Sequence, residues 1–335
     1  MRATNMRQME PEIQHPFLIG VDVGGTKILA SAVDERGSLL GRVSIPTDTR
    51  SPEATLDCIA LAVERAIREG GIPRQAVQAV GLGIPGLVDP VQGIGVASVN
   101  LNWMNVPVKA ALEERLGLSC AIENDVKAAA LGEARYGAGK GHESLIYLSI
   151  GTGIAGAVIL NGRLYRGPNG MAGEIGHAML ELDGPPCKCG GRGCFEALAA
   201  GPAIAARAAQ KLSHGKPSSL SPLNGTLTAE KVFEAARHGD AVALETIDEV
   251  SAYVAQAIQI LALAYDTPLL VLGGGVSIAG KPFLDPVASS LERLAMQTWV
   301  FGKIYHPGFL QPTRLGRDIG ILGAVSLVVP AIKVH

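Results

Sequence analysis

The chain is poor in aromatic residues and in cysteine, and it carries almost no excess charge. Phe, Trp and Tyr make up 4% of its 335 residues, only five cysteines are present, and 29 Lys and Arg stand against 31 Asp and Glu. No run of Lys or Arg is long enough to follow a phosphate backbone or an anionic membrane. We therefore expect neither nucleic acid nor a membrane surface as a partner.

Long apolar runs and a signal-peptide pattern are missing too. The apolar stretches break off before the ~20 residues of a membrane span. The run IGILGAVSLVVPAI from Ile319 contains two glycines and Pro330, and predicts a buried helix. The N-terminal MRATNMRQMEPEIQHPF lacks the apolar core of a signal peptide. We expect a cytoplasmic protein, in which clustered cysteines indicate metal binding or catalysis more often than structural disulfides.

Strand and helix signals alternate along the chain, and its length predicts about two domains. Two or three strands are expected in PFLIGVDVGGTKILASAVDERGSLLGRVSIPT, followed by a helix that Ser51 caps and Pro52 begins. The next predicted elements are a strand in AVGLGIPGLVD, a helix in VKAALEERL, a strand in CAIEND and a helix in VKAAALGEARYG. This alternation predicts an α/β fold with a largely parallel sheet.

The chain also repeats itself. The segment LIGVDVGGTKILASAVDERGSLLG, from Leu18, aligns without gaps with LIYLSIGTGIAGAVILNGRLYRG, from Leu145. Each copy has an apolar strand, a turn of small residues, a second apolar strand and a bend with glycine. The repeat predicts two related domains, each presenting a glycine turn to a ligand between them.

These turns are candidate phosphate-binding sites. A single one could be an ordinary glycine hairpin, but two matched copies favour a polyphosphate held by backbone N–H groups and threonine hydroxyls. Neither fits the P-loop pattern. A third glycine turn ends the strand PLLVLGGGVS, where α/β sheets commonly bind ligands. The predicted phosphate contacts are Gly24, Gly25, Thr26, Lys27, Gly151, Thr152, Gly153, Gly274 and Gly275.

Six motifs together resemble one known family. In order they are DVGGTK, GLGIPGLVD, ENDVKAAALGE, LSIGTGIAGAVI, GEIGH and CKCGGRGCFE. They are similar to those of the ROK family of bacterial sugar kinases and related repressors, from about Leu18 to the C-terminal helix. The resemblance implies a duplicated actin-like ATPase (ribonuclease H-like) fold, with two α/β domains and a ligand cleft between them. The expected parts are a frayed N-terminus over 1–16, a small domain over 17–122, a large domain over 123–317, and a helix at about 318–335 that packs back on the small domain.

The family likeness gives Asp125 the role of general base. An alcohol is a poor nucleophile, so a kinase needs a carboxylate that orients the hydroxyl and accepts its proton. Spacing alone would also allow Asn124 or Asp125 to be a helix N-cap. Many family members have a small residue and then Asn where this chain has Val126 and Lys127, which leaves the surroundings of the base open.

The likeness also implies the remaining substrate contacts. Carboxylates and amides suit a sugar because they pair with closely spaced hydroxyls and reject analogues that lack one. Asp22 resembles the residue that holds Mg²⁺, through water, since Mg²⁺ tends to keep its hydration shell. The implied sugar contacts are Gly86, Asn100, Asn124, Asp125, Glu174, His177 and Glu196.

The three clustered thiols of CKCGGRGC are candidate zinc ligands. Cys187, Cys189 and Cys194, with His177 ten residues upstream, form a tetrahedral Cys₃His set, whereas an iron–sulfur cluster would normally need four cysteines. Four protein ligands leave no position for an activated water, so the zinc would be structural and would fix Glu174 and Glu196 beside it. Cys58 and Cys120 lie outside this cluster, and we expect them to be simple buried thiols.

These features predict an ATP-dependent hexose kinase, with the 6-hydroxyl of glucose as the expected acceptor. Fructose, mannose, N-acetylglucosamine and N-acetylmannosamine are alternative acceptors, and polyphosphate is an alternative donor. A sugar-responsive repressor is the alternative of another class, disfavoured because 17 residues before the first predicted strand offer no helix-turn-helix domain. The family likeness further implies a homodimer or homotetramer.

Overall fold

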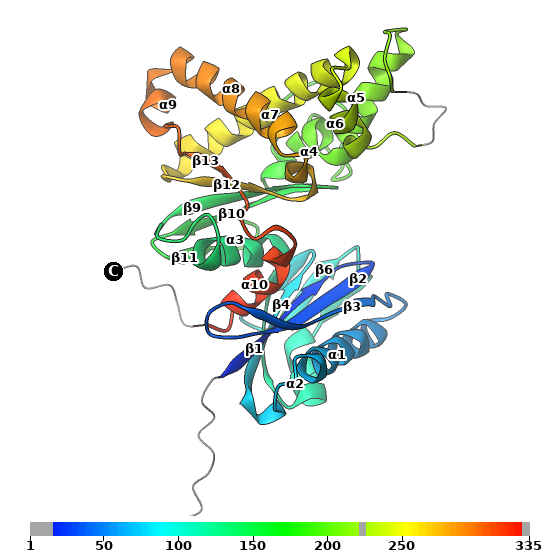
Figure 1. The fold of residues 1–335 in the computed structure, drawn as a ribbon, viewed down its shortest axis with the longest axis vertical. Helices are drawn as coiled ribbons and strands as arrows, with labels where there is room; N and C mark the ends of the chain where they lie inside the picture. The colour runs from blue at the N-terminus through cyan, green and yellow to red at the C-terminus, as the bar shows by residue number, and fades with distance from the viewer. Residues whose placement is uncertain (1–15, 221–225, 330–335) are drawn as a thin grey trace, which may run out of the picture. The chain divides into compact units, whose positions relative to one another are not determined.

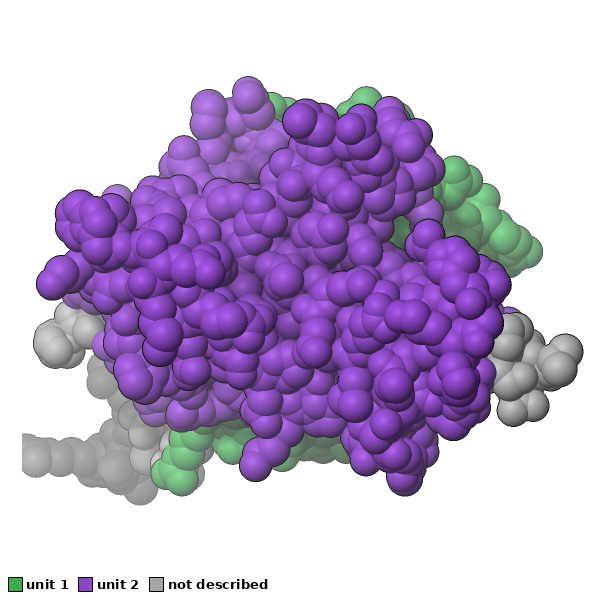
Figure 2. Space-filling model, turned by 90° about the horizontal axis from the view of Figure 1, so that it is seen from above, with its two compact units in different colours: residues 1–125, 320–329 green, residues 126–319, 330–335 purple. Residues whose placement is uncertain are grey.

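The computed structural model describes residues 16–220 and 226–329 (Figure 1). The chain divides into two compact units, coloured separately in Figure 2. Unit 1 contains the chain up to Asp125 and Gly320–Val329, and unit 2 contains Val126–Ile319. The expectation for residues 1–16 falls outside the described part apart from Pro16, as does that for residues 330–335.

Unit 1 is built on a mixed five-stranded sheet. Its strand order is β3-β2-β1-β4-β8. Strands β1 to β3 are joined by tight turns and run antiparallel, while β4 and β8 run parallel to β1. The expectation of a largely parallel sheet was wrong here, because tight turns can join only antiparallel neighbours. The strands are β1 (Phe17–Val23), β2 (Lys27–Val33), β3 (Leu39–Pro46), β4 (Val77–Ile84) and β8 (Ser119–Asn124).

The two faces of this sheet carry different helices. Ile19 and Val21 lie in one buried cluster with side chains of α1 (Pro52–Glu69) and α2 (Val108–Leu116). Between them along the strand, Gly20 faces α10 (Ile319–Ser326), since successive residues of a strand alternate in direction. Ser51 caps α1 as predicted, because its Oγ accepts a hydrogen bond of 3.2 Å from Ala54 N.

A small antiparallel sheet in unit 1 was not predicted. It has the order β5-β6-β7, and its connection between β6 and β7 carries Asn100. The strands are β5 (Leu87–Asp89), β6 (Ile94–Ser98) and β7 (Trp103–Val106).

Unit 2 repeats the main sheet of unit 1. Its order, β11-β10-β9-β12-β13, has the same sequence of antiparallel and parallel pairs, with β9 in the place of β1. The predicted duplication is thereby confirmed. The strands are β9 (Leu145–Ile150), β10 (Ile154–Leu160), β11 (Arg163–Tyr165), β12 (Leu270–Gly273) and β13 (Leu310–Pro312).

Helices cover both faces of the second sheet. Alanines of α3 share a buried cluster with Tyr147 and Val271 on one face, and the other helices form the main core with Leu148 and Leu272 on the opposite face. The helices are α3 (Asp125–Tyr136), α4 (Phe195–Ala199), α5 (Gly201–Ser213), α6 (Ala229–Arg237), α7 (Ala241–Tyr265), α8 (Lys281–Gln297) and α9 (Trp299–Ile304).

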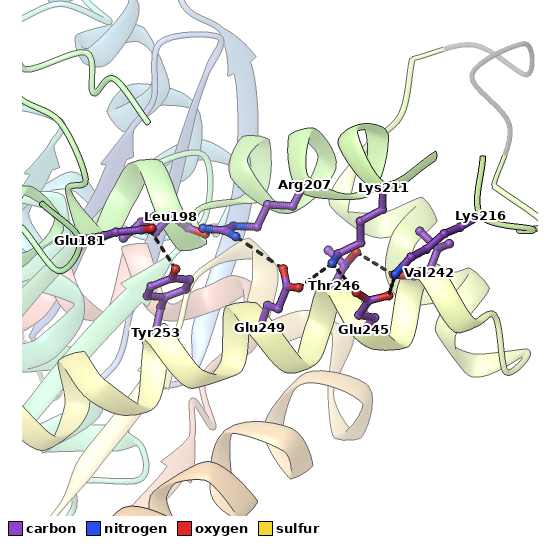
Figure 3. Close-up of polar contacts among 10 residues, drawn as sticks. All are labelled: Glu181, Leu198, Arg207, Lys211, Lys216, Val242, Glu245, Thr246, Glu249 and Tyr253. Carbon is purple, nitrogen blue, oxygen red and sulfur yellow. Dashed lines mark hydrogen bonds and ion pairs between the residues drawn. The ribbon is translucent and has the colours of Figure 1, made fainter. Parts of the chain in front are cut away.

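Helix α7 is long and apolar enough to cross a membrane by length and composition. Half of its apolar window is buried inside the protein, however, and it packs against α4, α5, α6 and α8. A row of ion pairs also joins it to α5 (Figure 3): Lys211 Nζ lies 2.8 Å from Glu245 Oε1 and 2.5 Å from Glu249 Oε1. These observations identify α7 as a core helix of unit 2.

Candidate functional site

Four predicted zinc ligands converge in unit 2. His177 ends a short 3₁₀ helix, Ile175–His177, and the three cysteines follow in the next loop. The four ligand atoms lie within 4.8 Å of one another. Cys187 Sγ is 3.8 Å from His177 Nδ1, and the Sγ atoms of Cys189 and Cys194 are 3.7 Å apart. All five cysteines of the chain are free thiols, so the cluster is not a disulfide.

This spacing fits a tetrahedral metal ion. With Zn–S bonds of about 2.3 Å, two sulfurs on a tetrahedron stand about 3.8 Å apart. Burial, and then the neighbouring thiols, raise the pKa of Cys194, whereas hydrogen bonds from the Gly191 backbone and from the other two thiols lower the pKa of Cys189. Three adjacent thiolates therefore need a compensating cation, which zinc would supply. Cys58 and Cys120 lie in unit 1, where burial raises the pKa of the Cys120 thiol to about 12.

Two glutamates flank the cluster. Glu174 is exposed and directly precedes the 3₁₀ helix, with its carbonyl accepting a hydrogen bond of 3.1 Å from His177 N. Glu196 is half-buried in α4, two residues after Cys194. Its Oε2 accepts a hydrogen bond of 2.9 Å from Ile154 N at the start of β10. The Cys₃His cluster and both glutamates thus belong to unit 2.

The second glycine turn opens onto a pocket of about 370 Å³ within unit 2. Gly151, Thr152 and Gly275, all predicted phosphate contacts, line it. Gly274 has a φ of +83°, and a Cβ there would lie 2.4 Å from Ile150 O, so only glycine lets the third turn approach β9 this closely. Gly153 lies instead against Glu196, where a Cβ would be 2.6 Å from Oε2.

Sequence reasoning missed the helical walls of this pocket. The first residues of α5, Gly201 and Pro202, and of α6, preceded by its N-cap Thr228, also line it. Two helix N-termini facing one pocket favour an anion, because the N-terminal end of a helix dipole is positive. Proline in the first turn of α5 and Thr228 before α6 were the available signals for these helix starts.

A second cavity, of about 310 Å³, continues along α6. It shares Glu230, Gly275 and Val276 with the first and extends to Phe233 and Ile278. The two cavities together offer a polar end at the glycine turns and a more apolar end beside α6.

The first glycine turn, in unit 1, is held by its own sheet. Gly24 N donates to Lys27 O at 2.9 Å, and Thr47 Oγ1 donates to Gly24 O at 2.6 Å. Asp22 is the last residue but one of β1 and lies beside Gly320, where a Cβ would be 2.4 Å from the carboxylate. Burial raises the pKa of Asp22, although the positive charge of Lys27 acts in the opposite direction.

Asp125 is the first residue of α3, directly after β8, and lies next to predicted partners in unit 1. The Asn124 side-chain amide donates to Gly86 O at 3.0 Å and to Asp125 Oδ1 at 3.0 Å. Gly86 has a φ of +103°, and a Cβ there would be 2.3 Å from Ala97 O, so this contact requires glycine. Asn100 packs against Gly25 of the first turn. The amide of Asn124 thus orients one oxygen of the Asp125 carboxylate.

Lys127, where this chain departs from the family pattern, is buried in α3. Its Nζ donates to Gly170 O, in the loop that leads to Glu174. The lysine therefore anchors a loop of unit 2 that precedes a predicted sugar contact.

The comparisons with known proteins agree with this architecture. The model of the ROK family matches residues 18–330. A glucokinase of Streptomyces coelicolor is 37% identical over 317 residues, which cover 92% of this chain and 96% of that protein. A xylose repressor of Bacillus subtilis is 28% identical and covers 93% of this chain, which spans 77% of the repressor.

Solved structures show the same fold. The structure of a ROK family glucokinase from Streptomyces griseus in complex with glucose and AMPPNP has a TM-score of 0.77 and 35% identity, covering 93% of this chain and 98% of that one. The fold is the predicted duplicated actin-like ATPase fold. Since the family match extends over nearly the whole length, the chain belongs to the ROK family.

Proposed function

We propose that this protein is an ATP-dependent hexose kinase that transfers the γ-phosphoryl group to the 6-hydroxyl of glucose. The observation that carries the proposal is the placement of Asp125, whose Oδ1 is held by the Asn124 amide beside Gly86 at the end of β8. The likeness of this chain to glucokinases, over more than nine-tenths of its length, supports the same reaction.

Asp125 acts as the general base in this proposal. The sugar hydroxyl attacks the γ-phosphorus, the bond from that phosphorus to the β–γ bridging oxygen breaks, ADP leaves, and the hydroxyl proton passes to Asp125. Asn124 keeps the carboxylate in one orientation, which lowers the cost of aligning it with the hydroxyl.

The pocket of unit 2 takes the nucleotide. The turns at Thr152 and Gly275 and the N-termini of α5 and α6 bind phosphate oxygens, and the second cavity along α6 takes the base. All of the predicted phosphate contacts stay predictions: Gly24, Gly25, Thr26, Lys27, Gly151, Thr152, Gly153, Gly274 and Gly275. Asp22 would hold Mg²⁺, which neutralises phosphate charge when bound.

The sugar is recognised by Gly86, Asn100, Asn124, Glu174, His177 and Glu196 in this proposal. His177, Cys187, Cys189 and Cys194 would hold a structural zinc ion, because the four ligand atoms fit its geometry and fill its coordination shell. A cytoplasmic location and a homodimer or homotetramer remain predictions.

The test is a coupled assay of ADP release over a panel of hexoses and N-acetylhexosamines, with ATP and polyphosphate as donors. Glucose with ATP is expected to give the highest kcat/KM. Preference for another sugar would correct the acceptor, and preference for polyphosphate would correct the donor. Failure with every pair, together with sugar-dependent DNA binding, would favour a repressor instead.

A further inference from the structure

The second glycine turn is fastened by three separate parts of unit 2. Gly201 N, at the start of α5, donates to Gly151 O at 2.8 Å. Gly274 packs against the backbone of Ile150. Glu196 is the third part and the only one that acts through a side chain, since its Oε2 accepts from Ile154 N at 2.9 Å. Two of these three contacts are made by backbone atoms, so Glu196 is the one side chain among them whose replacement would remove a contact.

The contact between Glu196 and this turn is closely fitted. A Cβ at Gly153 would lie 2.6 Å from Glu196 Oε2, so the absence of a side chain at Gly153 makes room for the carboxylate. The hydrogen bond spans 42 positions of the sequence and joins Glu196, two residues after Cys194, to the first residue of the strand after the turn. Among the described residues, the structure records no hydrogen bond to the other oxygen, Oε1.

We propose that Glu196 is a positioning residue of the nucleotide site, which couples nucleotide binding to sugar binding. This inference rests on the proposed function, in which Glu196 also contacts the sugar. Oε2 holds the turn that presents Gly151 and Thr152 to the nucleotide pocket, and Oε1 remains for a sugar hydroxyl. A sugar bound at Oε1 then fixes the carboxylate and hence the turn, so each substrate raises the affinity of the other.

The first test needs no ligand. The exchange rate of the Ile154 amide hydrogen is measured by NMR in the wild type, in Glu196→Ala and in Glu174→Ala. Loss of the hydrogen bond is expected to speed exchange of this amide at least tenfold in Glu196→Ala, whereas Glu174→Ala leaves it unchanged. Equal exchange rates in the wild type and Glu196→Ala would overturn the inference.

The second test measures coupling by calorimetric titration with Mg·AMPPNP, with and without glucose. Without glucose, Glu196→Ala is expected to weaken AMPPNP binding roughly tenfold, as loss of a hydrogen bond to a charged group can. Glu174→Ala is the matched control, because Glu174 is also a predicted sugar contact but has no hydrogen bond to the turn; its AMPPNP affinity is expected to stay within about twofold. Glu196→Gln retains an acceptor oxygen and is expected to recover most of the nucleotide affinity.

The outcomes separate the two proposals. If the wild type binds AMPPNP and Glu196→Ala binds it equally well, the positioning role is wrong while the kinase assignment stands. Equal weakening in Glu174→Ala would also overturn it, since the effect would then belong to the sugar site in general. If the wild type binds no AMPPNP, both proposals are wrong. Zinc content and melting temperature are measured for each variant, and full zinc occupancy in Glu196→Ala is expected.

Discussion

The two main sheets have the same strand order, but they differ in where the small residues lie at one helix–sheet contact. In unit 1 the glycines are in the sheet: Gly20 pairs with Gly81, and Cβ atoms there would lie 2.3 Å from Ile321 O and 1.9 Å from Ala324 O of α10. At the matching positions of unit 2, Tyr147 pairs with Val271. There the small residues lie in the helix instead, as the alanines of α3. The two units thus share a strand order, but the small residues that let a helix approach lie in the sheet of unit 1 and in the helix of unit 2.

The two glycine turns differ in a related way. The turn of unit 1 contains ionisable side chains, Asp22 and Lys27, and is fastened by Thr47 from the end of the neighbouring strand. The turn of unit 2 has no ionisable residue, and the carboxylate that holds it, Glu196, comes from α4, two residues after Cys194. Equivalent turns are thus held by an uncharged hydroxyl in one unit and by a carboxylate in the other.

If unit 1 supplies the base and unit 2 the nucleotide pocket, Asp125→Asn should separate turnover from nucleotide binding. We expect kcat to fall by roughly 10²- to 10⁴-fold, because Asn cannot accept the hydroxyl proton. Asn retains an Oδ1 acceptor for Asn124, so affinities for glucose and AMPPNP are expected to change by less than about threefold. Steady-state kinetics and calorimetry measure both quantities. Turnover near that of the wild type would remove Asp125 as the base.

The Cys₃His cluster adds to this comparison, since unit 1 has no such group among its described residues. Cys194→Ser is expected to remove zinc, to lower the melting temperature, and to weaken glucose binding at least tenfold, because the segments that carry Glu174 and Glu196 lose the cross-link between them. Elemental analysis, thermal unfolding and calorimetry are the measurements. Cys58→Ser, a thiol in α1, is the control and should retain about one zinc per chain. Full activity in zinc-free protein would contradict the structural role.

The close approach of α10 to the glycines of the unit 1 sheet can be tested at Gly81. In Gly81→Ala the added methyl group meets Ala324 O, so α10 must shift, and we expect the free energy of unfolding to fall by about 1–3 kcal/mol. Denaturant titration measures this change. Gly308→Ala is the control, because its Cβ would meet the His306 ring only at 3.4 Å and its φ lies outside the left-handed region. An equal effect of both substitutions would contradict the close approach of α10.

The helices that were predicted correctly have signals within their own short stretch of sequence. Ser51 with Pro52 began α1, and the predicted helix VKAALEERL matches α2 at Val108–Leu116. The β5-β6-β7 sheet was missed because its strands have only three to five residues and because Asn102, in the bend before β7, has a positive φ, where glycine is the usual signal.

The missed parts of the site depend on contacts between residues far apart in the chain. The motif around Thr152 indicates a ligand turn, but Gly201 and Thr228, which wall its pocket, lie about 50 and 75 positions further along. The hydrogen bond from Ile154 N to Glu196 likewise exists only after β10 and α4 pack together. Motifs therefore predicted the candidate reacting groups, whereas the residues that hold those groups could be found only from the fold.

The smallest effect on stability is expected from removing the N-cap side chains of α1 and α7. Ser51 caps α1 in unit 1, and Asp240 caps α7 in unit 2, where its Oδ1 accepts from Ala243 N at 3.0 Å. Burial alone would raise the pKa of Asp240, but hydrogen bonds from Ala243, Ser219 and Ser218 lower it from 3.8 to about 2. Because the folded pKa lies below the unfolded one, the carboxylate stabilises the fold above pH 4 and loses this contribution as the pH falls toward 2.

We therefore expect Asp240→Ala and Ser51→Ala to lower the free energy of unfolding by about 1 kcal/mol each at pH 7. At lower pH the two should diverge, since the serine hydroxyl does not titrate. The cost of Asp240→Ala should shrink between pH 4 and pH 2, while that of Ser51→Ala stays constant. Denaturant titrations at each pH measure the difference. A cost of Asp240→Ala that is independent of pH would mean that the hydrogen bonds to Asp240 do not depend on its charge.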